Sequence, residues 1–231
     1  MNQLKTLAAA AALLVSGLAS ATTLYAEDFT VSYDETTPGF GWISSQYYYG
    51  GVPGGVQGYA VEWSLSSAIN VSSAGGVPAS VTFAIPDFTI KATTGRVLTG
   101  DVISSLGDIV YFLNGANASA SIKATGSVSV NGGPAITLPS TPLDQIAITP
   151  TYGVFSGNAV FSGGSAFDSF SVSGASITLQ ASGGSFVGIG AHSQNKLKFD
   201  FATQAVPEPE TYAMLLAGLG IMGFIARRRQ R

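Results

Sequence analysis

The chain of 231 residues lacks cysteine and contains a single histidine. The absence of cysteine excludes a disulfide framework, a thiolate metal site and a cysteine nucleophile. One imidazole supplies too few ligands for a zinc site, so we expect neither a bound metal nor a cofactor. Stability must then come from apolar packing and backbone pairing.

Charged side chains make up only 10% of the chain, and basic ones are rare outside its two ends. The chain has 10 basic and 13 acidic residues, of which five basic and two acidic ones lie in the terminal segments described below. Residues 22–205 are left with 5 basic and 11 acidic side chains, a net charge of about −6. This balance disfavours binding to nucleic acid or to an anionic membrane surface.

The first 21 residues have the layout of a secretory signal. A weakly positive start precedes a nearly unbroken apolar run over residues 7–18. That run is too short to span a bilayer core of about 30 Å. Ala19 and Ala21 then provide the small-x-small pattern that signal peptidase accepts. We predict a signal helix over residues 1–21 that is removed to leave Thr22 first, with an uncleaved N-terminal anchor as the alternative.

The C-terminal segment, residues 206–231, has three abutting parts. Residues 206–211 are acidic, and their two prolines favour an extended backbone. Residues 212–226 are apolar or small throughout and predict a transmembrane helix, although about 22 Å is short for a permanent span. The positive-inside rule places the charge cluster that follows in the cytoplasm. That cluster consists of Arg227, Arg228, Arg229 and Arg231.

The order of Pro207, Glu208 and Pro209, an apolar helix and terminal arginines resembles the PEP-CTERM sorting domain. The resemblance implies an exosortase as partner, a multi-pass inner-membrane cysteine transpeptidase of Gram-negative bacteria that make extracellular polysaccharide. It also implies that these three residues are the recognition element and that the tail is removed on processing. The catalytic residues would belong to the exosortase, and none is expected here. An ordinary C-terminal membrane anchor is the alternative, but it leaves the Pro-Glu-Pro element unexplained.

Between the two ends, apolar and polar side chains alternate with a period of two, which is typical of half-buried strands. Glycine-rich turns separate the alternating runs, and no convincing helical period is present. We therefore predict an all-β passenger domain over residues 22–205, an antiparallel β-sandwich or jelly roll. The alternation is clearest in residues 29–33, 59–65, 175–181 and 197–201.

Two local features refine this prediction. Apolar positions change parity at Pro86, so we expect a bulge or an edge position there. The last predicted strand ends at Phe201, which leaves residues 202–205 as a tether to the sorting motif. Four residues reach at most about 14 Å, so we expect the folded domain to lie close to the membrane before processing.

Few side chains of the passenger domain suggest chemistry. His192 could form a triad with a serine and Asp168 or Asp200, but no serine lies in a nucleophile-elbow sequence. We therefore expect His192 to be a polar turn or surface residue. Oxygen ligands for calcium lack EF-hand spacing, and we expect them to be solvated. They belong to Asp28, Asp34, Glu35, Asp101 and Asp108.

Aromatic residues gather between positions 42 and 63, in a stretch that is also rich in glycine. Trp42, Tyr47 and Tyr48 are the candidate sugar contacts, because an aromatic face exposed on a sheet can stack against a sugar ring. Trp63 falls on the apolar parity of its strand and is expected in the core. Core and loop packing is the alternative for the other three.

These observations favour a non-catalytic protein that is exported across the inner membrane of a Gram-negative bacterium. Signal peptidase and exosortase would process it, with a transient inner-membrane anchor through the C-terminal helix and a final extracellular or cell-surface location. We expect the passenger domain to associate with exopolysaccharide or a biofilm matrix. Two other functions stay open: a carbohydrate-binding module, which would depend on the aromatic cluster, and an exported hydrolase, which would need His192 or a pair of carboxylates.

Overall fold

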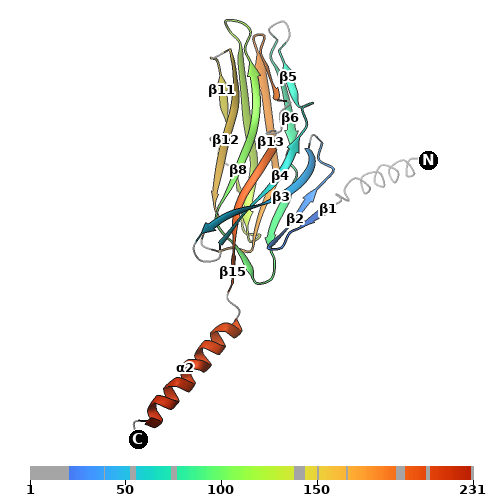
Figure 1. Cartoon of the computed structure of the whole chain (residues 1–231). Helices are drawn as coiled ribbons and strands as arrows, with labels where there is room; N and C mark the ends of the chain where they lie inside the picture. The colour runs from blue at the N-terminus through green and yellow to red at the C-terminus, as the bar shows by residue number, and fades with distance from the viewer. Residues whose placement is uncertain are drawn as a thin grey trace, which may run out of the picture.

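The computed structural model describes residues 21–38, 40–52, 56–73, 77–137, 144–149, 151–164, 166–190, 196–206 and 209–229. Within these ranges the chain forms β-strands as far as residue 205, and one helix, α2 (Pro209–Arg229), follows. Figure 1 shows the strands gathered into one elongated body, with α2 extending from its lower end. The predicted signal helix lies outside the described residues, apart from Ala21.

The strands form two sheets in which every pairing is antiparallel. The first sheet has eight strands in the order β1-β2-β7-β13-β9-β10, with β6 also paired to β13 and β11 to β9. Its strands are β1 (Ala21–Tyr25), β2 (Phe29–Asp34), β6 (Ala79–Ala84), β7 (Phe88–Ala92), β9 (Ser119–Val130), β10 (Ile136–Thr137), β11 (Gln145–Ala147) and β13 (Ser169–Ser182).

The second sheet has seven strands in the order β3-β4-β15-β8-β14-β5, with β12 also paired to β8. The last strand of the chain, β15, therefore lies in the interior of the sheet between β4 and β8. The strands are β3 (Phe40–Val52), β4 (Val56–Leu65), β5 (Asn70–Ser72), β8 (Arg96–Phe112), β12 (Tyr152–Ser162), β14 (Phe186–Ile189) and β15 (Lys196–Ala205).

The two sheets share one hydrophobic core. Phe88 of the first sheet has its ring centroid 4.8 Å from Trp63 and 4.7 Å from Phe199 of the second. Phe29 and Tyr59 meet across the sheets in the same way, at 5.0 Å. Tilted and edge-to-face ring pairs of this kind add to the energy of apolar burial. The all-β prediction is confirmed, and the arrangement is sandwich-like, while the jelly-roll topology stays a prediction.

The predicted alternation is confirmed in β13, where all the apolar positions of residues 175–181 are buried. It fails in β4 at Glu62, a residue of the polar parity that is only 6% exposed. Lys196 of the neighbouring β15 forms an ion pair with the Glu62 carboxylate. The alternation pattern predicts that the Glu62 carboxylate lies in solvent. It is instead buried and paired with the ammonium group of Lys196 on the adjacent strand.

The change of parity at Pro86 corresponds to a break between two strands. Both β6 and β7 pair with β13, and Pro86 lies in the link between them. The bulge predicted here lies in β13 instead, whose register to β9 shifts between Ser173 and Ser176. Within the bulge, the N–H of Gly174 donates to the Asp87 carboxylate at 2.8 Å. The irregularity is therefore accommodated by the partner strand.

Candidate functional site

The C-terminal segment of residues 206–231, named the sorting segment from here on, is joined directly to an interior strand of the second sheet. β15 continues to Ala205, four residues beyond its predicted end. Residues 202–205 pair with residues 96–99 of β8, and residues 202–204 also pair with β4. The N–H of Val206 donates to the Gly95 carbonyl at 2.9 Å. The predicted four-residue tether is therefore wrong, because strands on both sides satisfy the backbone groups of these residues.

A buried carboxylate holds the end of β15. Asp28 is 1% exposed and accepts hydrogen bonds from the hydroxyls of Thr203, at 2.8 Å, and Tyr59, at 2.7 Å. Its other oxygen forms an ion pair with Arg96 at 2.9 Å. These partners bring together β4, β8, β15 and the start of β2, so the network connects both sheets. The expectation that Asp28 is a solvated carboxylate is wrong.

The other acidic candidates do not converge with it. Asp101 and Asp108 both lie on β8, whereas Asp34 ends β2 and Glu35 follows it. Among the described residues, no three histidine, aspartate or glutamate side chains lie close enough together to hold a metal ion.

The sorting motif falls at the junction between β15 and α2. Pro207 and Glu208 lie outside the described residues, and Pro209 is the first residue of α2. Proline suits the start of a helix, where its missing N–H would have no intrahelical partner. α2 contains the whole of the predicted helix over residues 212–226. In the parts of the chain that the structure describes, no helix combines the length and apolar character needed to cross a membrane.

The predicted charge cluster lies at the far end of α2. Arg227 is exposed, Arg228 and Arg229 complete the helix, and Arg231 is beyond the described residues. Cations in the last turn of a helix interact favourably with its dipole. This arrangement keeps the arginines at the end of the helix opposite the sorting motif.

At the other end of the chain, the predicted signal peptidase site adjoins β1. Ala19 lies outside the described residues, and Ala21 is the first residue of β1. Thr22 pairs with Tyr33 of β2. Cleavage after Ala21 would therefore leave the strand from Thr22 onward intact.

The candidate sugar contacts Trp42, Tyr47 and Tyr48 all lie on β3, at the edge of the second sheet. Tyr47 pairs with Tyr59 of β4. The side chains of the three candidates lie outside what the structure describes, so their role stays a prediction. Trp63, which was predicted in the core, is 1% exposed.

The residues considered for hydrolysis are only partly described. His192 lies outside the described residues. Asp168 is exposed after the isolated bridge between Leu98 and Phe167, and Asp200 forms an ion pair with Lys198 at 2.9 Å. The structure therefore gives no distance between His192 and the other members of the hypothetical triad.

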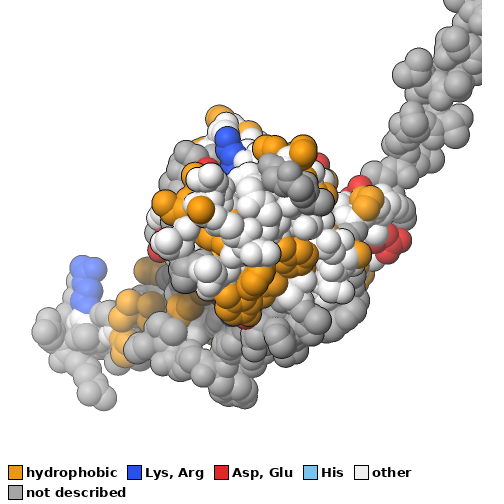
Figure 2. All heavy atoms as spheres, turned by 90° about the horizontal axis from the view of Figure 1, so that it is seen from above, with side chains coloured by type: hydrophobic (Ala, Val, Ile, Leu, Met, Phe, Trp, Pro, Cys, Tyr) orange, Lys and Arg blue, Asp and Glu red, His pale blue; other side chains and the backbone are white. Residues whose placement is uncertain are grey.

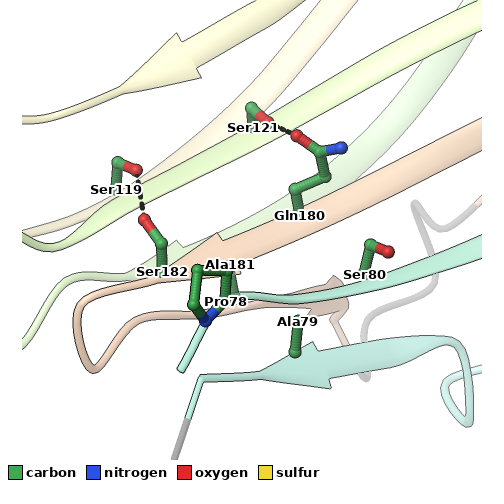
Figure 3. A pocket seen from close by; sticks show the side chains of 8 residues that line it. All are labelled: Pro78, Ala79, Ser80, Ser119, Ser121, Gln180, Ala181 and Ser182. Carbon is green, nitrogen blue, oxygen red and sulfur yellow. Dashed lines mark hydrogen bonds between the residues drawn. The ribbon is translucent and has the colours of Figure 1, made fainter. Parts of the chain in front are cut away.

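A polar hollow of about 230 Å³ lies over β6, β13 and β9 (Figure 3). The Ser119 and Ser182 hydroxyls are 2.6 Å apart, and the Ser121 hydroxyl donates to the Gln180 amide oxygen at 3.3 Å. No ionisable side chain lines it, so it suits an uncharged polar ligand. The lining residues are Pro78, Ala79, Ser80, Ser119, Ser121, Gln180, Ala181 and Ser182.

A second hollow, of about 260 Å³, lies at the end of β2 and combines aromatic with acidic side chains. Thr36 donates to the Asp34 carboxylate from its hydroxyl, at 2.6 Å, and from its N–H, at 2.9 Å. These two bonds, the hydroxyl first, lower the pKa of Asp34 below 3.8. Burial and then the charge of Glu35 raise the pKa of Tyr33 above 10.0. The lining residues are Tyr33, Asp34, Glu35, Thr37, Phe40, Trp63 and Pro86.

The sequence indicates neither hollow. Alternation does place Gln180 and its polar neighbours on the outer face of their strand. However, β9 and β13 are far apart in the chain, and only their pairing places Ser121 opposite Gln180. The second hollow likewise depends on the packing of Trp63 against the end of β2.

The described surface has little charge. Figure 2, which views the molecule from above, shows few Lys, Arg, Asp or Glu side chains on the described surface. Most of that surface is backbone and side chains that are neither charged nor hydrophobic, with apolar side chains in scattered places and in one larger patch. This agrees with the low charged fraction of the sequence. Recognition by such a surface has to rely on hydroxyl, amide and apolar contacts more than on ion pairs.

Some solved structures resemble the chain loosely. A chain of infectious bursal disease virus Gx strain shares 16% identity, covers 67% of this chain and 37% of its own length, and gives a TM-score of 0.27. The VP2 subviral particle of the same virus gives 14% identity, 94% and 63% coverage, and a TM-score of 0.23. A carbohydrate-binding module from the β-sandwich superfamily gives 8% identity, 80% and 95% coverage, and a TM-score of 0.16.

These similarities are too weak to support an inference about function. The chain spans 37%, 50% and 52% of the length of the first three viral chains that it resembles. No curated protein matches the chain.

The C-terminal segment, in contrast, matches a family model. The model for the PEP-CTERM protein-sorting motif covers residues 205–230. It starts at the last residue of β15 and includes the whole of α2. The motif implies export, exosortase targeting and membrane-anchored transit before processing. The chain is a PEP-CTERM sorting domain-containing protein.

Proposed function

We propose that this chain is a non-catalytic extracellular or surface protein that signal peptidase and exosortase process and that associates with exopolysaccharide or a biofilm matrix. The observation that carries the proposal is the PEP-CTERM motif, which begins where the folded domain ends. A signal peptide over residues 1–21 would deliver the chain across the inner membrane of a Gram-negative host. The passenger domain would then be the part that remains outside.

In this proposal α2 is a transient inner-membrane anchor. The large apolar side chains of α2 that the structure describes are between 53% and 75% exposed, so lipid or a membrane enzyme would remove them from water. The apolar residues 212–226 span about 22 Å as a helix, less than the roughly 30 Å core. Local thinning and snorkelling of the arginines would make up the difference. Such a marginal anchor suits a segment that is to be removed. The exposed apolar residues are Met214, Leu215, Leu216, Leu219, Ile221 and Met222.

The sorting step is tested by replacing Pro207-Glu208-Pro209 with Ala-Gln-Ala in the native host. We expect the unaltered protein to start at Thr22 and end near residues 207–209, and the variant to keep its C-terminus and stay in the inner membrane. Intact mass and terminal sequencing measure both ends. Pro134→Ala, an exposed proline in a passenger loop, is the matched control and should be processed normally. Normal processing of the Ala-Gln-Ala protein would contradict the proposal.

Association with polysaccharide is a separate part of the proposal. In cells that make no exopolysaccharide, we expect the processed protein to move from the cell-associated fraction to the medium. Immunoblots of washed cells and medium measure the change. Equal retention in both strains would show that the polymer does not hold the protein.

A carbohydrate-binding module is the second candidate. The uncharged polar hollow of Figure 3 favours it, because hydroxyl and amide groups can exchange hydrogen bonds with a neutral sugar. Trp42 and Tyr48 on β3 are the candidate stacking residues. Glycan-array binding that Gln180→Ala, Trp42→Ala or Tyr48→Ala abolishes would favour this function. An exported hydrolase has less support and would require an activity that His192→Ala removes.

A further inference from the structure

The chain contains two Asn-Gly pairs, Asn114-Gly115 and Asn131-Gly132, and the structure gives them different surroundings. In such a pair the backbone nitrogen of the glycine can attack the asparagine Cγ, because glycine has no side chain to obstruct the approach. The attack needs a free glycine N–H and an asparagine side chain that can rotate towards it. Neither glycine N–H has a hydrogen-bond partner among the described residues. The two pairs therefore differ in the freedom of the asparagine.

Asn131 is held by the start of β13. Its side-chain oxygen Oδ1 accepts hydrogen bonds from the backbone N–H groups of Asp168, at 2.6 Å, and Ser169, at 3.0 Å. Its own N–H donates to the Ser169 carbonyl at 2.9 Å, and its backbone has φ +52°. Rotation of the side chain towards Gly132 would break both side-chain bonds and leave two N–H groups without that acceptor. The folded chain therefore opposes the attack at this pair.

Asn114 lacks such restraints. Its side chain is exposed and forms no hydrogen bond with the described residues. It lies in the loop that follows β8, where the N–H of Leu113 donates to the Thr151 carbonyl at 2.6 Å and the N–H of Ala118 donates to the Gly115 carbonyl at 3.2 Å. Neither bond involves the Asn114 side chain or the Gly115 nitrogen. The two reacting groups are therefore free to approach each other.

We propose that Asn114 is a site of spontaneous deamidation and that the folded chain protects Asn131. The Gly115 nitrogen loses its proton and bonds to the Asn114 Cγ, the Cγ–Nδ2 bond breaks, and ammonia leaves with that proton. The product is a five-membered succinimide. Water then opens the ring at one of its two carbonyl carbons, which gives aspartate when the N–Cγ bond breaks and isoaspartate when the original peptide bond breaks. The net reaction consumes one water, releases one ammonia and replaces an amide by a carboxylate.

The new carboxylate would lie far from the sorting segment. β8 begins at Arg96, which pairs with Ala205 at the end of β15, and it ends at Phe112, just before Asn114. Asn114 therefore follows the end of β8 that is opposite to the sorting segment. Because charged side chains make up only 10% of the chain, each conversion adds a charge to a surface that has few. This modification does not depend on the proposed function.

Incubation of the full-length chain in detergent micelles and neutral buffer tests the proposal. Trypsin cleaves after Arg96, Lys123 and Lys196, so the two asparagines are recovered on separate peptides, residues 97–123 and 124–196. Incubation in H₂¹⁸O labels each new carboxylate, and mass spectrometry with fragmentation locates the label. We expect Asn114 to convert at least about tenfold faster than Asn131, since two hydrogen bonds oppose the reaction of Asn131.

Denaturation and one variant provide the controls. In guanidinium chloride the bonds to Asp168 and Ser169 are lost, so both pairs should convert at similar rates. Asn114→Gln should remove the labelling at that position, because ring closure through one more methylene is much slower, and should leave the rate at Asn131 unchanged.

Three results in the folded chain would overturn the proposal. Equal rates at the two pairs would show that the bonds to Asn131 do not protect it. Faster conversion of Asn131 would mean that its two N–H partners stabilise the negative charge that develops on Oδ1 during the attack. Conversion of both pairs in guanidinium chloride but of neither in the folded chain would show that the loop after β8 protects Asn114 as well.

Discussion

At the scale of single residues, Asp28 depends most on distant partners. Its carboxylate is shared by Thr203, Tyr59 and Arg96, and the first of these lies 175 positions away in the chain. Removing one member of a buried ion pair is costly because it leaves the other groups unpaired. Arg96 is partly exposed and can regain water, and the Tyr59 hydroxyl keeps the Gln57 side-chain oxygen as an acceptor at 2.9 Å. The Thr203 hydroxyl, in contrast, is buried with the carboxylate.

We expect Asp28→Ala to lower the free energy of unfolding by about 3 kcal/mol. Urea unfolding monitored by tryptophan fluorescence measures the change in the free energy of unfolding. Asp101→Ala, which removes an exposed carboxylate on β8, should change it by less than about 0.5 kcal/mol. Similar small effects of both substitutions would mean that the Asp28 network adds little to stability.

A second residue-scale prediction concerns Asp34. Its pKa lies below 3.8 because the Thr36 hydroxyl and N–H bind the ionised carboxylate. A carboxyl whose pKa is lower in the folded than in the unfolded state stabilises the fold above pH 3.8, and this contribution disappears as the pH falls through the lower, folded value.

Thr36→Val should therefore raise the pKa of Asp34 towards 3.8, since the hydroxyl is the larger cause of the shift. Carboxyl NMR titration measures it. Thr37→Val is the matched control, because that hydroxyl donates to the backbone carbonyl of Asp34 and not to its carboxylate. An unchanged Asp34 pKa in Thr36→Val would refute the assignment.

At the scale of elements, tight turns between long strands determine where glycine is required. Gly183, between β13 and β14, has φ +65°, and an added Cβ would lie 2.3 Å from the Asn117 carbonyl oxygen. Gly164 has φ +88° but open space around the added atom. The two positions therefore share backbone strain and differ in steric clash.

Gly164→Ala should destabilise the protein by about 1 kcal/mol, the cost of a left-handed alanine. Gly183→Ala should cost at least about 3 kcal/mol, because a backbone segment has to move as well. Thermal unfolding of the two variants side by side measures the difference. Equal losses would indicate that the turn at Gly183 adapts without strain.

At the scale of the whole molecule, both predicted processing sites lie directly beside paired strands. Thr22 is already paired in β1, and the N–H of Val206 is still bonded to Gly95. Removal of both terminal segments leaves the passenger domain with all its strands. A domain built in this way can be released from its targeting signals without loss of fold.

This geometry predicts a sharp limit for truncation. A chain ending at Val206 should unfold at the same urea concentration as the full-length chain. A chain ending at Ala202 lacks Thr203 and the paired residues after it, and should lose about 3 kcal/mol or more. Limited proteolysis and urea unfolding compare the two. Equal stability would show that the end of β15 contributes nothing to the fold.

Sequence patterns predicted the fold class well but not its boundaries. Alternation in residues 197–201 located β15, yet missed its continuation to Ala205. The continuation is apparent only when β4 and β8 are seen on both sides of it. The parity change at Pro86 likewise indicated an irregularity, but the register shift occurs on the partner strand β13. Strand ends and bulges depend on pairing between distant segments, which a local pattern does not contain.

The sequence by itself determined the sorting motif and the β-rich character of the passenger domain. Both can be recognised locally, because a proline-rich motif, an apolar helix and period-two alternation each depend on residues that are close together in the chain. The tertiary structure alone decided that Asp28 is buried and that the sorting segment leaves from an interior strand. These features join residues as far apart as Asp28 and Thr203. Their energies arise from burial and pairing, which exist only after the two sheets have packed.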